Sequence, residues 1–522
     1  MIITENRRIA LNTAATYGRS LVSLCFGLWT SRWVLQALGK EDFGLYGVVG
    51  GLIAFVVLLN NVMANSVGRF YAFAIGEARN LSLEQGQEHV CGWFNTALTI
   101  HSVLPILLVL IGWPIGEYAI RNWLIIPTGR LDACIWVFRF SLIGAFFNMI
   151  SVPYMAMFRA KQWIVEQSVW SIVQTMLMFV LAYSLLSFEG DKMFVYAGFV
   201  TAITCFVLFM QIIRARMKFP ECKIRLGRLM NFKQLKLLLG FGFWEVFSCF
   251  GDICRQHGTA FLINRRFDAG VNAAYGIAMQ VSVHTTSLSQ ALLGALSPAV
   301  TSATGEGNKE RSVRLGLYSS KFSSFLVAIF AIPLVLEMDE VLALWLVTPP
   351  EWTAALCRAI LIALVIHKLG WGNHMLVMAS GKIAGLECCL ALTSLFTLPL
   401  IWVLINYGAG AVGIGYAFIV SYAALSIIRV VFSWRQVGLS ITRWIMGAVL
   451  PVLCVVVVMG LSGWIIILNF KPSFIRVLTT SSVCLCCGLF TAWFVLMTAE
   501  NRSCLRAIVS DVVRTLRSRS GV

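Results

Sequence analysis

Fourteen long apolar runs, each bounded by charged or turn residues, follow one another along the chain. The runs are continuous and about 20 residues or longer, which is the length that an α-helix needs to cross the hydrocarbon core of a bilayer. A transmembrane β-barrel would instead show shorter segments of alternating hydrophobicity. We therefore predict fourteen transmembrane helices, at residues 12–35, 44–68, 91–116, 132–156, 164–187, 193–213, 237–263, 272–299, 316–336, 353–378, 383–405, 410–432, 444–468 and 474–498.

The composition narrows the class of protein. Of the 522 residues, 59% are hydrophobic and 12% are charged, and that charged share is about half that of an ordinary soluble domain. Such a chain cannot cover a soluble fold with polar surface, which excludes a soluble enzyme, a disordered protein and a secreted disulfide scaffold. The predicted fold class is an all-α, polytopic membrane protein. Its second, eighth and tenth helices are polar enough for a hydropathy plot alone to miss them.

Charge indicates how the helices are oriented. The net charge is +17, and roughly two thirds of the Lys and Arg residues fall on the side that holds both termini and the loop at 214–236. The loop at 337–351, on the opposite side, carries acids and no base. Because positive residues collect on the cytoplasmic side, we expect both termini to be cytoplasmic. The bases are also expected to contact anionic lipid headgroups. Nearly all of the 15 cysteines lie within the apolar runs, and neither a zinc site nor a disulfide framework is indicated.

Two dipeptides recur and suggest a parallel internal repeat. Tyr46-Gly47 precedes Gly76-Glu77 at the same spacing at which Tyr275-Gly276 precedes Gly305-Glu306. Each pair brackets the second helix of one half of the chain. We therefore predict two six-helix lobes around a central cavity, joined by a basic linker and followed by two extra helices. The predicted limits are 1–213 for the N-lobe, 214–236 for the cytoplasmic linker, 237–433 for the C-lobe, 434–498 for the last two helices, and 499–522 for a basic cytoplasmic tail.

Charged side chains within a bilayer are costly, so those inside the predicted helices mark candidate sites. The seventh helix carries one polar stripe, made of Glu245, Ser248, Asp252, Arg255, Gln256 and Thr259. One interpretation is a water-filled cavity in which Glu245 and Asp252 couple transport to an ion. The alternative is that Asp252 and Arg255 neutralise each other and only hold helices together.

Other predicted helices also place polar groups within the membrane. Bases outnumber acids among them, and a basic cavity implies an anionic ligand such as a phosphate. Histidines in these helices are more typical of hydrogen-bonded packing than of proton transfer. The predicted substrate-binding residues are Arg19, Asn61, Asn65, Arg139, Arg255, Gln280, Gln290, Arg358 and Lys368.

Four motifs resemble those of bacterial polysaccharide flippases of the Wzx type. The first is the turn Leu38-Gly39-Lys40-Glu41-Asp42-Phe43-Gly44-Leu45-Tyr46. The others are Val271-Asn272-Ala273-Ala274-Tyr275-Gly276-Ile277-Ala278, Ser297-Pro298 with Gly305-Glu306, and Leu344-Trp345-Leu346. These flippases belong to the multidrug/oligosaccharidyl-lipid/polysaccharide exporter (MOP) superfamily. The resemblance covers most of residues 10–435 and fixes no catalytic residue.

The resemblance implies a flippase in the bacterial inner membrane that moves an undecaprenyl-pyrophosphate-linked oligosaccharide to the periplasmic leaflet by alternating access, for surface polysaccharide biosynthesis. Its partners would be this lipid-linked substrate, membrane lipids and other polysaccharide-assembly proteins, with no nucleic acid. A second hypothesis is a cation-coupled drug antiporter of the same superfamily, whose cavity should be acidic or aromatic. A third is a glycan polymerase or ligase, which needs a large outer loop with acid–base residues. The outer loop near 117–131 offers only Glu117, Arg121 and Arg130. We therefore predict no enzyme and no cofactor, and leave H⁺ or Na⁺ coupling open.

Overall fold

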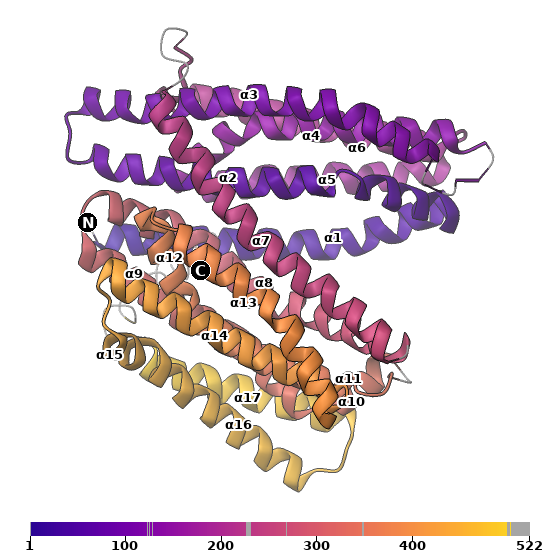
Figure 1. Ribbon diagram of the computed structural model, residues 1–522, viewed down its shortest axis with the longest axis vertical. Coiled ribbons are helices and arrows are strands. Elements are labelled where there is room, and N and C mark those ends of the chain that lie inside the picture. The colour runs from indigo at the N-terminus through magenta and orange to yellow at the C-terminus, as the bar shows by residue number, and fades with distance from the viewer. Residues whose placement is uncertain are drawn as a thin grey trace, which may run out of the picture. The chain divides into compact units, whose positions relative to one another are not determined.

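The computed structural model describes residues 2–122, 124, 126–127, 129–225, 231–267, 269–346, 349–497 and 502, and every regular element in them is helical (Figure 1). Eleven of these helices are long and apolar enough to cross a membrane. The pair α11 (Thr353–Leu369) and α12 (Trp371–Ser380), bent by 41° at their junction, meets the same test only when the two helices are taken together. The chain is therefore an all-α, multi-pass membrane protein, as predicted. Apart from residue 502, the predicted tail at 499–522 lies outside the described residues.

The three helices that the sequence predicted to be polar, the second, eighth and tenth, are not among the eleven helices counted as apolar enough to span a membrane. The second, α2 (Ala54–Ala78), and the eighth, α8 (Ala269–Gly305), have 25 and 37 residues. At about 1.5 Å per residue both exceed the thickness of a bilayer core, but neither is apolar enough to be counted with the eleven. The tenth is the bent pair α11 and α12. The total of fourteen spans remains a prediction.

The described chain forms two compact units. The first unit comprises residues 11–243 and 305–307, and the second comprises residues 1–10, 244–304 and 308–522. The predicted lobe limits at 213 and 237 remain predictions. The first unit contains most of α1, all of α2 to α6, and the start of α7. The bounds of these helices, apart from α2, are Ile2–Gly51 (α1), Leu83–Asn122 (α3), Leu131–Ala160 (α4), Ile164–Ser184 (α5), Lys192–Lys218 (α6) and Phe232–Arg266 (α7).

One end of the first unit is held together by one arginine. Gly39 has a φ of 77°, a left-handed conformation that suits glycine, and it interrupts α1 just before Asp42. Arg130, next to the start of α4, donates to Asp42 over 2.8 Å and to Asp191 over 3.0 Å. Asp191 in turn caps α6 by accepting from the backbone N–H groups of Met193 and Phe194. The Asp42 hydrogen bond raises the pKa of Arg130, so this cation stays charged and ties three helices together.

The segment that follows α6 folds back onto α3. Asn95 donates to the Lys223 carbonyl oxygen over 3.1 Å and accepts from the Arg225 backbone N–H over 2.9 Å. The Glu221 carboxylate pairs with Lys161 at 2.7 Å. The described part of the predicted linker is therefore anchored to the first unit.

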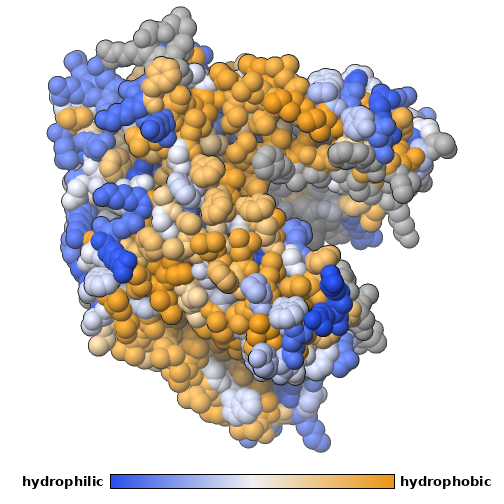
Figure 2. Space-filling model, viewed as in Figure 1, coloured by the Kyte–Doolittle hydropathy of each residue, from blue (hydrophilic) through white to orange (hydrophobic). Residues whose placement is uncertain are grey.

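The second unit repeats the packing order of the first. In the first unit α3 packs on α4, α4 on α6, and α5 on α6; in the second, α9 packs on α11, α11 on α14, and α13 on α14. Figure 2 shows apolar side chains over the middle of the helices of each unit and hydrophilic ones near the helix ends. The remaining helices are Lys309–Leu336 (α9), Met338–Leu346 (α10), Ala384–Leu404 (α13), Val412–Val437 (α14), Ile441–Trp444 (α15), Leu450–Asn469 (α16) and Phe474–Val495 (α17).

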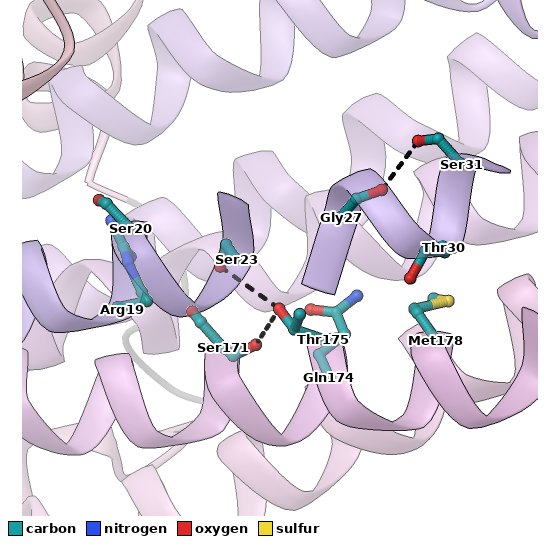
Figure 3. Close-up of a pocket in the computed structure, with 10 residues that line it drawn as sticks. All are labelled: Arg19, Ser20, Ser23, Gly27, Thr30, Ser31, Ser171, Gln174, Thr175 and Met178. Carbon is teal, nitrogen blue, oxygen red and sulfur yellow. Dashed lines mark hydrogen bonds between the residues drawn. The ribbon is translucent and has the colours of Figure 1, made fainter. Parts of the chain in front are cut away.

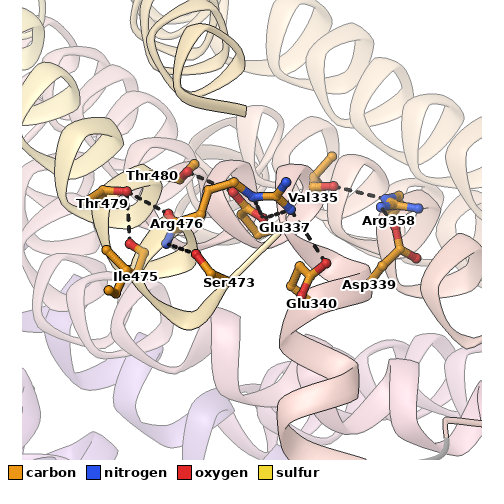
Figure 4. A network of polar contacts seen from close by, with 10 residues as sticks. All are labelled: Val335, Glu337, Asp339, Glu340, Arg358, Ser473, Ile475, Arg476, Thr479 and Thr480. Carbon is orange, nitrogen blue, oxygen red and sulfur yellow. Dashed lines mark hydrogen bonds and ion pairs between the residues drawn. The ribbon is translucent and has the colours of Figure 1, made fainter. Parts of the chain in front are cut away.

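The last two long helices, α16 and α17, pack on each other and on α9. Near the N-terminus of α17, Arg476 donates to Glu337 over 2.8 Å, and Thr480 donates to the other carboxylate oxygen over 2.8 Å (Figure 4). At the opposite end of α17, Lys321 of α9 donates to the Leu496 carbonyl oxygen over 2.7 Å. The two-helix addition is thus attached to α9 near both ends of α17.

Candidate functional site

A polar groove runs between α1 and α5 in the first unit (Figure 3). Ser23 and Thr175 face each other across it at 3.4 Å, and its volume is about 550 Å³. Beside it the two helices are held by aromatic contacts, including Trp33 against Phe179 at 4.8 Å. The groove is lined by Arg19, Ser20, Ser23, Gly27, Thr30, Ser31, Ser171, Gln174, Thr175 and Met178.

One arginine lines this groove. Arg19 lies on α1 within the lining, and Arg159, in the last turn of α4 and outside that lining, is near enough to be influenced by its positive charge. No acidic residue lines the groove. Within the described part of the chain, Arg19 forms no ion pair with an acid. A cation without an acid partner inside a membrane protein is unfavourable unless an anion accompanies it, so the groove is suited to an anionic ligand.

Two other predicted binding residues are paired with acids instead. Arg139 of α4 donates to Glu117 of α3 over 2.7 Å and lies over the ring of Trp136. Arg358 of α11 donates to Asp339 over 2.5 Å. Glu117 also belongs to α3, which continues to Asn122, so the loop predicted near 117–131 is shorter than the sequence suggested. Because both arginines have a neutralising partner, they add little net charge for a ligand.

The polar stripe on α7 is organised around Asp252. Its carboxylate accepts from Arg255 over 3.1 Å and from Ser394 of α13 over 2.7 Å. The Arg255 side chain is only 10% exposed and lies 4.8 Å from the ring centre of Tyr422. The Glu245 side chain, on the same helix, is likewise engaged in a polar or electrostatic contact and is not free. Close packing makes the α7–α13 contact possible, because a side chain at Gly251 would meet the Ala391 backbone at 2.7 Å.

Sequence reasoning missed two buried charges that complete this cluster, Glu387 of α13 and Arg429 of α14. Glu387 accepts a hydrogen bond from His374 Nε2 over 2.9 Å. Arg429 lies 3.3 Å from a ring nitrogen of His367 and 4.5 Å from the ring centre of Trp371. Both residues are charged and fall inside the predicted helices 383–405 and 410–432, which was the signal available in the sequence.

The same cluster surrounds the break between α11 and α12. Lys368, buried, lies 4.8 Å from the ring centre of Trp371. The backbone carbonyls near the break are satisfied by side chains: Ser323 donates to Lys368, and Trp444 donates to Leu369. A broken helix within a membrane requires such partners. The cluster of the second unit therefore holds three cations, Arg255, Lys368 and Arg429, against two acids, Asp252 and Glu387.

The predicted amide residues lie in both units. Asn61 lines a second pocket of the first unit together with Asn60 and Asn148, whereas Asn65 is exposed and outside that lining. Gln280 and Gln290 are exposed on α8 in the second unit. That the candidate residues of the two units face one central cavity stays a prediction.

No family model and no curated protein matches the sequence. Several solved structures do match, each covering 83% of this chain. They include a mutant MATE (TM-score 0.70, 15% identity, 96% of that chain) and an outward-facing multidrug resistance MATE transporter of the MOP superfamily (0.65, 13%, 95%). A third is a MOP superfamily transporter from Pyrococcus furiosus (0.66, 14%, 96%), for which the reverse polarity of the binding pocket suggests a different function. The chain shares the fold of these transporters.

Proposed function

We propose that this protein is a flippase of the Wzx type, which moves an undecaprenyl-pyrophosphate-linked oligosaccharide from the cytoplasmic to the periplasmic leaflet by alternating access. The fold it shares with MOP transporters supports transport in general. The observation that carries the specific proposal is the groove between α1 and α5, whose lining holds Arg19 and no acid.

The chemistry of the groove matches both parts of such a substrate. A pyrophosphate presents adjacent anionic oxygens, and planar guanidinium groups bind such oxygens through paired hydrogen bonds. The rest of the groove offers serine, threonine and glutamine side chains. These groups both donate and accept hydrogen bonds, as sugar hydroxyls require.

A cation-coupled drug antiporter is the second candidate. Its support is the fold of the matched MATE structures and two acids of the second unit, the exposed Asp252 and the buried Glu387. However, Asp252 contacts Arg255 in the structure, and Glu387 contacts His374. A cationic drug would therefore meet acids that already have partners, whereas an anionic substrate would meet Arg19 of the groove without a competing acid. We favour the flippase for this reason.

The proposal includes a setting in the cell. We place the protein in the bacterial inner membrane with both termini cytoplasmic, since most basic loops lie on that side. Its product would feed assembly of a cell-surface polysaccharide, such as O-antigen, capsule or exopolysaccharide. Neither a cofactor nor covalent chemistry is required, and an H⁺ or Na⁺ gradient can supply the driving force.

Deletion of the gene in its native host tests the proposal. Lipid-linked glycan should accumulate on the cytoplasmic side, and mass spectrometry of the lipid extract should identify one undecaprenyl-pyrophosphate oligosaccharide. Complementation with Arg19→Ala should fail to clear the lipid, whereas Arg225→Ala, which removes an exposed arginine paired with Glu88, should clear it. If the deletion strain accumulates no glycan lipid but becomes sensitive to cationic drugs, the antiporter is the better assignment.

A further inference from the structure

A second pocket in the first unit has a lining without any charged residue. Its volume is about 300 Å³, at the lower end of the range for small-molecule sites. It shares no lining residue with the groove between α1 and α5. The pocket is lined by Tyr46, Ile53, Val56, Val57, Asn60, Asn61, Ser141, Gly144, Ala145, Asn148, Ala197, Val200, Thr201 and Thr204.

Asparagine side chains provide hydrogen-bonding capacity on one wall. Asn60 donates to Asn148 over 2.7 Å, which orients both amides. The carbonyl oxygen of Asn60 is buried and has no hydrogen-bond partner. A buried acceptor without a partner is costly, and a hydroxyl of a ligand would satisfy it. Asn61, one residue further along α2, adds a third amide to the lining.

Hydroxyl groups from two other helices add to this capacity. Thr201 of α6 donates to the Phe140 carbonyl oxygen over 3.0 Å, and Thr204 donates to that of Val200 over 2.8 Å. Both hydroxyl protons are engaged. The Thr204 oxygen also accepts from Gln174 over 3.4 Å, so the Thr201 oxygen is the freer acceptor of the two. Ser141 of α4 lies in the same lining.

The apolar wall of the pocket is formed by Tyr46 and the aliphatic side chains of α2. The Tyr46 ring packs against Tyr196 with ring centres 5.1 Å apart, which fixes its orientation. Val56 and Val57 extend the apolar wall. A sugar ring has the complementary character, because its edge carries hydroxyl groups and its faces carry C–H groups that pack on apolar side chains.

We propose that this pocket binds one neutral sugar ring of the transported glycan. A sugar acid is disfavoured because no cation lines the pocket, and a buried carboxylate without a partner is unfavourable. The inference rests on the proposed function, which supplies the glycan, but it adds a separate site for sugar recognition. The arginine groove would hold the pyrophosphate regardless of the sugar, and this pocket would select the sugar.

Binding measurements on the purified full chain in lipid nanodiscs test this site. The probes are undecaprenyl pyrophosphate alone, and the same lipid carrying N-acetylglucosamine or galacturonic acid. Asn61→Leu and Asn148→Leu should weaken binding of the N-acetylglucosamine lipid about tenfold and leave binding of the bare lipid unchanged. Ser141→Ala and Thr204→Val should weaken binding of the N-acetylglucosamine lipid about threefold. Because these two substitutions barely change side-chain volume, misfolding is a poor explanation for such a loss. The control Asn122→Leu removes an exposed amide at the end of α3 and should bind both lipids as wild type does.

The two proposals fail in different ways. If the pocket variants bind the N-acetylglucosamine lipid as tightly as wild type while Arg19→Ala loses both lipids, the sugar site is wrong and the flippase stands. Binding of the galacturonic acid lipid as tightly as the N-acetylglucosamine lipid would also overturn the neutral-sugar assignment. If wild type binds neither the bare nor the sugar-bearing lipids, the proposed function itself fails.

Discussion

The carboxylate of Glu337 is completely buried, and it accepts from Arg476 of α17 over 2.8 Å while Thr480 donates to its second oxygen. Arg476 itself is only 10% exposed in its side chain and also approaches Glu340 at 3.8 Å. Ser473 caps α17 by accepting from the Arg476 backbone N–H. This ion pair joins the end of α9 to the start of α17, as Figure 4 shows.

Removing one partner of this pair should therefore destabilise the second unit. Glu337→Ala removes the hydrogen-bonded partner of the buried Arg476 and leaves it only the more distant Glu340 carboxylate at 3.8 Å, so we expect a loss of about 3 kcal/mol. The double variant Glu337→Leu/Arg476→Met should recover most of that loss, because it leaves no buried charge. Thermal unfolding of the detergent-solubilised chain checks both, with exposed Lys382→Ala as the control. Equal stability of Glu337→Ala and wild type would show that the pair does not hold α17.

Because Arg139 is paired with Glu117, we predict that Arg139 has a structural role, whereas the sequence alone predicted that it binds substrate. Glu117→Gln should lower stability because it leaves the Arg139 charge uncompensated within the membrane. Arg139→Gln combined with Glu117→Gln should restore stability and retain glycan export. Expression level and export in the native host measure the two effects separately. If the double variant is stable but fails to export, Arg139 contacts the substrate after all.

Thiol chemistry reports on the segment after α6. Burial raises the pKa of the Cys222 thiol well above its usual range, and the neighbouring Glu221 adds to the shift. Because the thiolate is the reactive form, alkylation of Cys222 by iodoacetamide should be slow at pH 7 and should rise steadily through pH 9 without a plateau. The raised pKa also means that this thiol contributes stability below its ordinary pKa that is lost as the pH rises through the folded value.

Mass spectrometry of the peptide that contains Cys222 gives this labelling rate despite the other cysteines. The comparison is the exposed position next to it, in a Lys223→Cys/Cys222→Ser variant, which should label rapidly. Unfolding in sodium dodecyl sulfate should remove the protection of Cys222. Rapid labelling of Cys222 in the folded protein at pH 7 would contradict its placement against α3.

Ion coupling is best tested at Asp252 and Glu245, the acids predicted for it. Asp252 is held by Arg255 and Ser394, so Asp252→Asn should disturb the Arg255 position and reduce transport. Glu245→Gln tests the second acid directly. Transport into proteoliposomes under an imposed pH gradient should fall in both variants if protons drive the cycle. If the transport rate is the same with and without an imposed proton or sodium gradient, transport is not coupled to either ion.

Helix limits followed from the sequence where capping residues or turns mark them. The predicted start at residue 474 coincides with α17, because Ser473 caps it, and the predicted start at 164 coincides with α5. The second helix was less accurate: it was predicted at 44–68, whereas α2 is Ala54–Ala78. The polar residues Asn60, Asn61 and Asn65 obscure the apolar pattern there, and α1 continues past its break at Gly39 to Gly51.

The individual charges of the candidate site could be predicted, but their partners could not. Arg19 and Arg255 were identified because a charge within an apolar run is rare. The pairing of Arg139 with Glu117, and of Arg358 with Asp339, depends on which helices are neighbours. That information lies in the packing of separate spans, and no local periodicity contains it. For the same reason the contact of Glu387 with His374 was not foreseen.

Transport of a pyrophosphate-linked lipid should depend most on Arg19 in the groove between α1 and α5, and on Arg159, which is influenced by its charge. The lipid-linked glycan that accumulates in the deletion strain, reconstituted into proteoliposomes with the purified protein, allows flipping to be measured directly by the access of an external glycan-modifying enzyme. Wild type and Arg225→Ala should flip the lipid at equal rates. Arg19→Ala and Arg159→Ala should each lose most of the activity, and Arg19→Lys should recover part of it, because a lysine keeps the charge but not the paired hydrogen bonds. Normal flipping by the well-folded Arg19→Ala/Arg159→Ala double variant would contradict the account.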